Sequence, residues 1–142
     1  MKLYSINTGY FKLDGGAMFG VVPKSIWQKI NPADENNMCS WALRCLLVEE
    51  GDRRILIDNG IGEKQDAKFF SYYYLHGDDT LGKSLRAHGF TEDDITDVFL
   101  THAWGEGKSN HERVKVINAA LKKKGLLTWF DDERMEGDIK AK

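Results

Sequence analysis

The sequence predicts an α/β fold in which an antiparallel sheet continues into a mixed sheet covered by helices. In the first half, short apolar runs with period-two alternation are separated by tight turns, which indicates paired strands. Further on, an apolar run at 98–101, a helical pattern at 109–124 and a second apolar run at 126–130 follow one another. This order is typical of a right-handed βαβ crossover with parallel strands. At 142 residues, we expect one compact domain over 1–142.

Composition and charge exclude several classes of protein. A hydrophobic content of 42% with 30% charged residues and 2 prolines fits a globular chain and not a disordered one. The net charge of -2 offers no case for a nucleic-acid partner. No window is apolar enough for a membrane span and no signal peptide is recognisable, so we expect a cytoplasmic protein without a membrane partner. Cys39 and Cys45 lack a CxxC spacing, so we interpret both as small buried hydrophobes.

The opening of the chain predicts a hairpin or meander. An alternating run at 2–8 leads through Asp14-Gly15-Gly16 into a second apolar run at 17–22. Pro23 ends that run, and 24–30 is either a single helical turn or an irregular flap. The remaining elements are expected as strands at 38–49, 54–57, 98–101 and 126–130 and as helices at 65–75, 81–88 and 109–124, with a capping box at 91–94.

Two polar residues follow predicted strands and are the candidate site residues. Asp58 comes after the run 55–57, and His102 comes after 98–101. In α/β proteins, sites gather beyond the carboxyl ends of strands, so the two side chains could face one crevice. Asp58 either orients a ligand histidine or caps the turn that follows it. His102 is either a metal ligand or a hydrogen-bonded structural residue, and its next neighbours offer no further ligand.

The other candidate residues favour structural interpretations. His76, His88 and His111 are not at the spacing of metal-ligand pairs, so we interpret them as loop and helix residues. Aromatic side chains such as Phe69 and Phe70 are interpreted as core or interface residues.

Residues 1–102 resemble the N-terminal half of a lactonase-like metallo-β-lactamase-fold hydrolase. This resemblance implies an αββα sandwich whose HxHxDH motif binds two metals, usually zinc, that generate a hydroxide nucleophile. The matching runs are Gly15-Gly16-Ala17-Met18-Phe19-Gly20-Val21-Val22-Pro23-Lys24, Asn31-Pro32-Ala33-Asp34-Glu35-Asn36-Asn37, Ile55-Leu56-Ile57-Asp58-Asn59-Gly60-Ile61-Gly62 and Asp97-Val98-Phe99-Leu100-Thr101-His102.

The metal motif is broken in this chain. His102 matches the first ligand, but Trp104, Glu106 and Gly107 stand at the following three ligand positions. The resemblance implies that Asp58 orients a metal-ligating side chain without binding the metal itself. It also implies that the later ligands lie in the second half of the sandwich, which the chain does not contain. A catalytic zinc needs about three protein ligands. We therefore expect no cofactor, although zinc is the metal of the family, and an inactive relative of lactone and ester hydrolases.

From about Asp97 onward, the chain resembles the start of a Toll/interleukin-1 receptor (TIR) domain. The matching runs are 99–105, 110–125 and 127–131, followed by a loop at 134–139. The glutamate that NAD-cleaving TIR domains require would come after Lys142, so NAD cleavage is the least favoured function. A TIR-like interaction module is the second function, and its expected contact residues are Arg134, Met135, Glu136, Gly137 and Asp138.

The two resemblances overlap at 97–102, so we infer a chimeric chain in which neither site is complete. The expected fold is then a partial metallo-β-lactamase-like sheet with helices, extended by a right-handed βαβ unit of TIR-like sequence. Half of a sandwich leaves apolar surface uncovered. We therefore expect self-association through the exposed sheet or through the TIR-like loop, and marginal stability.

Overall fold

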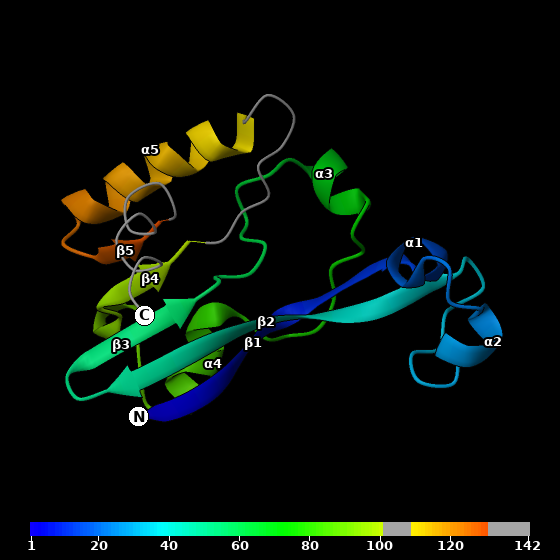
Figure 1. The fold of residues 1–142 in the computed structure, drawn as a ribbon, viewed down its shortest axis with the longest axis horizontal. Helices are drawn as coiled ribbons and strands as arrows, with labels where there is room; N and C mark the ends of the chain where they lie inside the picture. Colours follow the sequence, from blue (N-terminus) through cyan, green and yellow to red (C-terminus); the bar gives the residue numbers. More distant parts are fainter. Residues whose placement is uncertain (101–108, 131–142) are drawn as a thin grey trace, which may run out of the picture.

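The computed structural model describes residues 1–100 and 109–130 and shows an α/β fold built on one five-stranded mixed sheet (Figure 1). The strand order is the chain order, β1-β2-β3-β4-β5. The first two pairings are antiparallel and the last two are parallel, and the antiparallel β2-β3 pair and the parallel β4-β5 pair are those that the sequence predicts. The strands are β1 (Lys2–Asp14), β2 (Met38–Glu50), β3 (Arg53–Ile57), β4 (Asp97–Phe99) and β5 (Leu127–Trp129).

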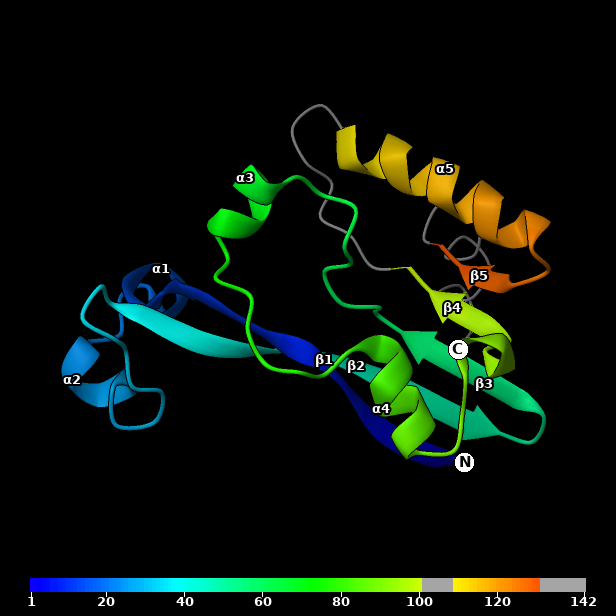
Figure 2. The ribbon, with the colours of Figure 1, turned by 180° about the vertical axis from the view of Figure 1, so that it is seen from behind.

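In the part of the chain that the structure describes, five helices and one 3₁₀ turn connect these strands. Figure 2 shows that α1 and α2 lie together at the far end of the long β1-β2 ribbon, and that α5 lies beside β4 and β5. The helical segments are α1 (Gly15–Phe19), α2 (Lys24–Trp27), α3 (Ala67–Ser71), α4 (Leu81–Ala87), η1 (Glu92–Asp94) and α5 (Ser109–Lys123).

The predicted opening hairpin is wrong. β1 continues to Asp14 and pairs with β2 on both sides of an irregularity between Asn7 and Tyr10, while the apolar run expected to be the second strand begins as helix α1. The side chain of Asp14 accepts a hydrogen bond from the backbone nitrogen of Ala17 at 2.8 Å, which caps the helix. Phe19 then stacks on Trp27 of α2, with ring centroids 4.8 Å apart. A cap and a tertiary aromatic contact therefore override the strand-like pattern.

The later elements follow the prediction more closely. The capping box at Thr91 is present, and α4 and α5 end before Gly89 and Gly125, which both have φ of 83°. The helix expected at 65–75 is shorter, because α3 ends at Ser71 and Tyr74 already adopts a φ of 45°. The parallel β4-α5-β5 unit is confirmed, and its right-handed crossover stays a prediction.

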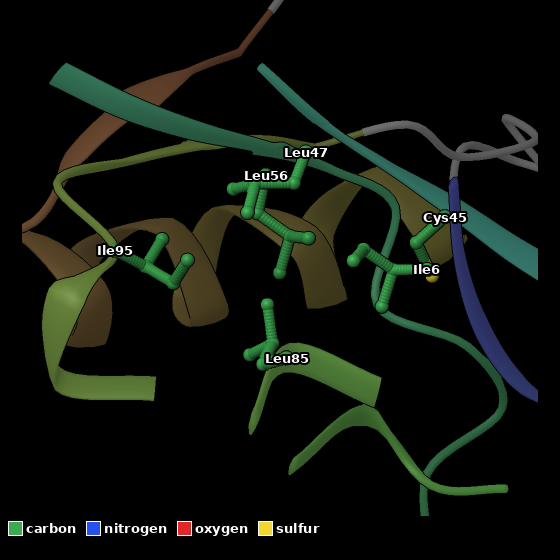
Figure 3. Close-up of a cluster of buried hydrophobic side chains, with 6 residues drawn as sticks. All are labelled: Ile6, Cys45, Leu47, Leu56, Leu85 and Ile95. Carbon is green, nitrogen blue, oxygen red and sulfur yellow. The ribbon is translucent and has the colours of Figure 1, made fainter. Parts of the chain in front are cut away.

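Both long helices cover the same face of the sheet. Leu56, Val98 and Thr128 are register partners on β3, β4 and β5, so their side chains point to one face. Leu85 of α4 packs into the cluster that contains Leu56, and Thr128 donates a hydrogen bond to Asn118 of α5. Figure 3 shows Leu85 rising from α4 toward Leu56 and Leu47. The core is the cluster Ile6, Cys45, Leu47, Leu56, Leu85 and Ile95.

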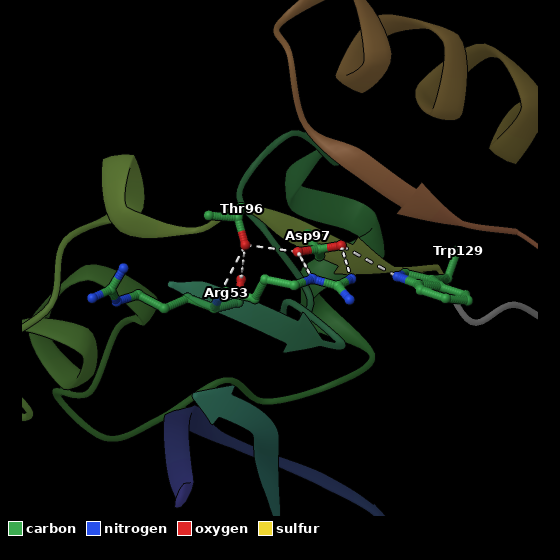
Figure 4. A network of polar contacts seen from close by, with 5 residues as sticks. Arg53, Thr96, Asp97 and Trp129 are labelled. Carbon is green, nitrogen blue, oxygen red and sulfur yellow. Dashed lines mark hydrogen bonds and ion pairs between the residues drawn. The ribbon is translucent and has the colours of Figure 1, made fainter. Parts of the chain in front are cut away.

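The opposite face carries a buried charge. Asp97 of β4 is 0% exposed and lies on the same face as Arg53 and Trp129. Its carboxylate accepts hydrogen bonds from Arg53 Nη2 at 2.5 Å, Thr96 Oγ1 at 2.7 Å and Trp129 Nε1 at 3.4 Å (Figure 4). Burial by itself would raise the pKa of Asp97, but the hydrogen bonds from Arg53 and Thr96 outweigh it and lower the pKa. The carboxylate is therefore held ionised inside the fold.

The cysteines and the lengths of the helices can also be compared with the sequence predictions. Cys39 and Cys45 are free and buried, which confirms their interpretation as small hydrophobes. Among the helices that the structure describes, none combines the length and the apolar character needed to cross a bilayer.

Candidate functional site

Because β3 and β4 are parallel, the chain segments that follow their carboxyl ends leave the sheet at the same end. Ile57 is the register partner of Phe99, so Asp58 and Leu100 leave the two strands side by side. Leu100 continues the parallel pattern by donating its backbone N–H to the carbonyl of Trp129 at 3.0 Å. His102 lies outside the described residues, as do Arg134 to Asp138, so their predicted roles stay predictions.

Asp58 caps the turn that follows it. The residue has a φ of 67°, a left-handed conformation that aspartate tolerates better than most side chains. Its Oδ1 accepts hydrogen bonds from the backbone nitrogens of Asn59 at 2.6 Å and Gly60 at 3.0 Å. The turn-capping interpretation therefore holds. Within residues 1–100 and 109–130, Oδ2 accepts no hydrogen bond, so this oxygen remains available to a group beyond them.

An aromatic cavity of about 460 Å³ lies beside Asp58. Phe11 of β1 and Phe69 of α3 contribute to its wall, and both rings contact Tyr73, with centroid separations of 6.3 and 4.9 Å. Arg44 and Asp58 also line the cavity, so its wall includes one positive and one negative side chain. Cavities that combine apolar walls with a few polar groups are the usual form of small-molecule sites. The remaining lining residues are Ala42, Leu43, Gly60 and Ile61.

The aromatic wall was missed at the sequence level. Phe69 was interpreted as a core or interface residue, whereas the fold places it on the cavity. No local pattern separates these outcomes, because the wall forms only when the segment after α3 returns to β1. Lys12 of β1 donates its backbone N–H to the carbonyl of Tyr73 at 2.7 Å and fixes that return.

Cys45 lies behind the Asp58 turn as an inert thiol. Burial raises its pKa to about 11, with a further contribution from the negative charge of Asp58. Hydrogen bonds from Thr8 and from the backbone of Gly60 oppose this rise only in part. The thiolate is the form that binds metals and attacks electrophiles. Cys45 is therefore neither a ready ligand nor a nucleophile at neutral pH.

The described residues do not form a catalytic zinc site by themselves. Within 1–100 and 109–130, no group of three or more His, Cys, Asp or Glu side chains is placed to hold a metal ion. His111 is 2% exposed and stacks on Phe130 with centroids 5.0 Å apart, and the ring of His88 packs against Tyr4. Both histidines are structural, as their sequence spacing predicts.

Part of the chain matches a known protein family. Residues 44–103 match the Metallo-beta-lactamase superfamily, and this stretch contains β3, β4 and Asp58. The comparison with curated proteins gives no match. None of these findings supports a TIR-like segment, so the C-terminal half of the sequence resemblance has no support.

Two solved structures extend this result to the fold. A probable metal-dependent hydrolase from Staphylococcus aureus is 32% identical with a TM-score of 0.64, over 71% of this chain and 37% of its own. AidC, a dizinc quorum-quenching lactonase in complex with a product N-hexnoyl-L-homoserine, is 29% identical with a TM-score of 0.50, over 71% of this chain and 32% of its own. The chain thus spans about a third of the length of these hydrolases. Its five-stranded sheet is consistent with a partial metallo-β-lactamase fold, and residues 44–103 match the model of that superfamily.

Proposed function

We propose that this chain descends from lactone and ester hydrolases of the metallo-β-lactamase fold and has no metal-dependent hydrolytic activity. The supporting observation is the ligand count. Among the described residues, no three potential ligands converge on one point, and a catalytic zinc takes about three protein ligands. In the neighbouring stretch, the motif positions after His102 are occupied by Trp104, Glu106 and Gly107.

In this proposal, Asp58 stabilises the turn that follows it and does not orient a metal ligand. By capping the turn at 58–60, its carboxylate fixes the backbone that forms one wall of the aromatic cavity. The same turn is packed tightly, because a Cβ on Gly60 would collide with the hydroxyl of Thr8. In this proposal, the chain keeps the cavity beside Asp58 but has no metal chemistry.

Zinc content tests the proposal directly. The purified chain, dialysed against zinc and then against metal-free buffer, should retain well under one zinc per chain and should open no lactone ring. The variant Trp104→His/Glu106→Asp/Gly107→His completes the family motif and should bind more zinc than the wild type. His88→Ala removes a histidine that packs on Tyr4 and is the matched control, expected to leave zinc content unchanged.

Two outcomes would contradict this proposal. One is a stoichiometric zinc in the wild type together with lactone opening that is lost in His102→Ala. The other is a variant with the completed motif that binds no more zinc than the wild type. That result would show that the missing motif ligands are not what prevents zinc binding.

The second candidate function is self-association through the face of the sheet opposite α4 and α5. Phe99 and Leu127 belong to this face and are 42% and 50% exposed. Contiguous exposed apolar residues commonly mark interaction sites. We expect sedimentation velocity to show concentration-dependent dimers that Leu127→Lys weakens, while Val116→Lys on the exposed side of α5 does not. A monomer at every concentration would eliminate this candidate.

A further inference from the structure

Ser40 and His76 form a hydrogen-bonded pair outside the Asp58 cavity. Ser40 is on β2, and His76 is on the segment between α3 and α4, 36 positions later. Ser40 Oγ lies 2.7 Å from His76 Nε2. Both residues are exposed, so a reagent can reach the hydroxyl. A nucleophile and a base in hydrogen-bond contact are the minimal arrangement for covalent catalysis.

The backbone sets the direction of this hydrogen bond. His76 Nδ1 lies 2.9 Å from the carbonyl oxygen of Tyr74, and a carbonyl can only accept. Nδ1 therefore carries the proton, and in the neutral ring Nε2 is the acceptor. The hydroxyl of Ser40 must then donate to Nε2. This is the arrangement in which a histidine removes a proton from a serine, with a third group orienting the ring.

Three further contacts hold the imidazole in place. The backbones of Tyr10 and His76 exchange two hydrogen bonds, of 2.9 and 3.0 Å. The ring of Tyr10 stacks on the imidazole with centroids 5.6 Å apart at 27°. Tyr74 adopts a φ of 45°, a strained conformation for a tyrosine, and its carbonyl is the one that meets Nδ1. Strain of this kind persists only where the surroundings enforce it.

A positive charge lies across from Ser40 on the neighbouring strand, and an open cleft lies beside His76. Lys12 is the cross-strand partner of Ser40, so the two side chains share a face of the ribbon. The hydrogen bond to Asp34 at 2.7 Å raises the pKa of Lys12, and the ammonium therefore stays charged beside the serine. His76 also lines a cleft of about 900 Å³ together with Tyr10, Leu75 and Gly77. The cleft beside His76 offers space for a small acyl substrate, and the Lys12 ammonium, which is paired with Asp34, lies on the same face of the ribbon as Ser40.

We propose that Ser40 is a nucleophile activated by His76 that accepts an acyl group from small activated esters, without a metal. The Ser40 oxygen forms a bond to the carbonyl carbon while its proton moves to His76 Nε2. The bond from that carbon to the ester oxygen then breaks, and the proton passes from Nε2 to the departing alkoxide, which leaves as an alcohol. The products are acyl-Ser40 and the alcohol, and no oxidant or reductant takes part. This activity goes beyond the proposed function and does not depend on it.

A fluorophosphonate probe tests the proposal in the presence of a chelator. The probe reacts by the same route: the serine oxygen bonds to phosphorus, the phosphorus–fluorine bond breaks, and fluoride and the proton leave. Intact-mass and peptide-mass spectrometry should show one adduct per chain, located on Ser40. Ser40→Ala should abolish it, and His76→Ala should slow labelling by about 100-fold, the lower end of what a positioned base contributes.

Matched variants separate this chemistry from general effects. Ser71→Ala removes another exposed hydroxyl, which donates to the carbonyl of Lys68, and should label like the wild type. His88→Ala should also label like the wild type. Ser40→Cys retains a nucleophile and should be alkylated by iodoacetamide faster with His76 present than in Ser40→Cys/His76→Ala. Circular dichroism identifies any variant that fails to fold.

The outcomes are decisive in both directions. A folded wild type that is not labelled at Ser40, or equal labelling rates with and without His76, would overturn the proposal. Because the chelator removes zinc, absence of labelling leaves the zinc prediction standing, and an unexpected zinc site would leave the labelling result standing.

Discussion

Replacing Leu85 by alanine should lower the free energy of unfolding by about 3 to 4 kcal/mol, within the range measured for buried leucines. Leu85 is 0% exposed and is the residue through which α4 enters the core cluster against Ile6, Leu47 and Leu56. Its loss removes transfer free energy and leaves a cavity between the helix and the sheet, because neither element can close the gap alone. Urea unfolding followed by circular dichroism measures the change.

The control for this variant lies one residue along the same helix. Arg86→Ala breaks an ion pair with Glu92 whose two side chains are 60% and 58% exposed, so solvent screens it. We expect that variant to remain within about 0.5 kcal/mol of the wild type. A Leu85→Ala protein as stable as Arg86→Ala would show that α4 does not anchor the sheet.

Asp97→Asn should destabilise the protein by about 2 to 3 kcal/mol at pH 7, the usual loss when a charged hydrogen-bonding partner is removed. The carboxylate is fully buried, but the Arg53 side chain is 48% exposed, so solvent screening keeps the loss below that of a fully buried pair. The amide of asparagine can accept from Trp129 or Thr96 but cannot match the charge of Arg53. Chemical denaturation at several pH values measures the difference.

The sign of the pH dependence follows from the direction of the pKa shift. The folded-state pKa of Asp97 lies below the ordinary value of 3.8, so its stabilising effect is complete above that value. The effect disappears as pH falls through the lower folded-state pKa. The stability difference between wild type and Asp97→Asn should therefore be constant near neutrality and shrink in strong acid. Asp52→Asn, in the exposed turn before β3, is the control and should show little difference at any pH.

The sequence predicts those parts of the fold that depend on local rules. The β2-β3 hairpin follows from its turn, and α5 follows from its apolar spacing and from the glycine after it. The run at 17–22 has too few residues to separate a strand from a helix. Its outcome depends on the Asp14 cap and on the contacts of Phe19 with Trp27 and Trp41, which the fold supplies.

The two candidate sites also differ in whether a local sequence signal marks them. Asp58 is identifiable because a polar residue at the end of a buried strand is a local signal, and the structure shows its carboxylate capping the turn that follows. No local signal marks Ser40 with His76. Their contact requires the bridge between Tyr10 and His76 and the register of β1 on β2, which brings Lys12 opposite Ser40.

The strand order of the sheet has a consequence for how the chain is made. Within the described residues, each strand pairs only with its immediate neighbours along the chain, so none of these five strands has to insert between two that are already joined. The β1-β2 ribbon can form before β3 is synthesised, and each later strand adds to an existing edge. Assembly can therefore proceed vectorially from the N-terminus, with the growing edge of the sheet as the template for the next segment.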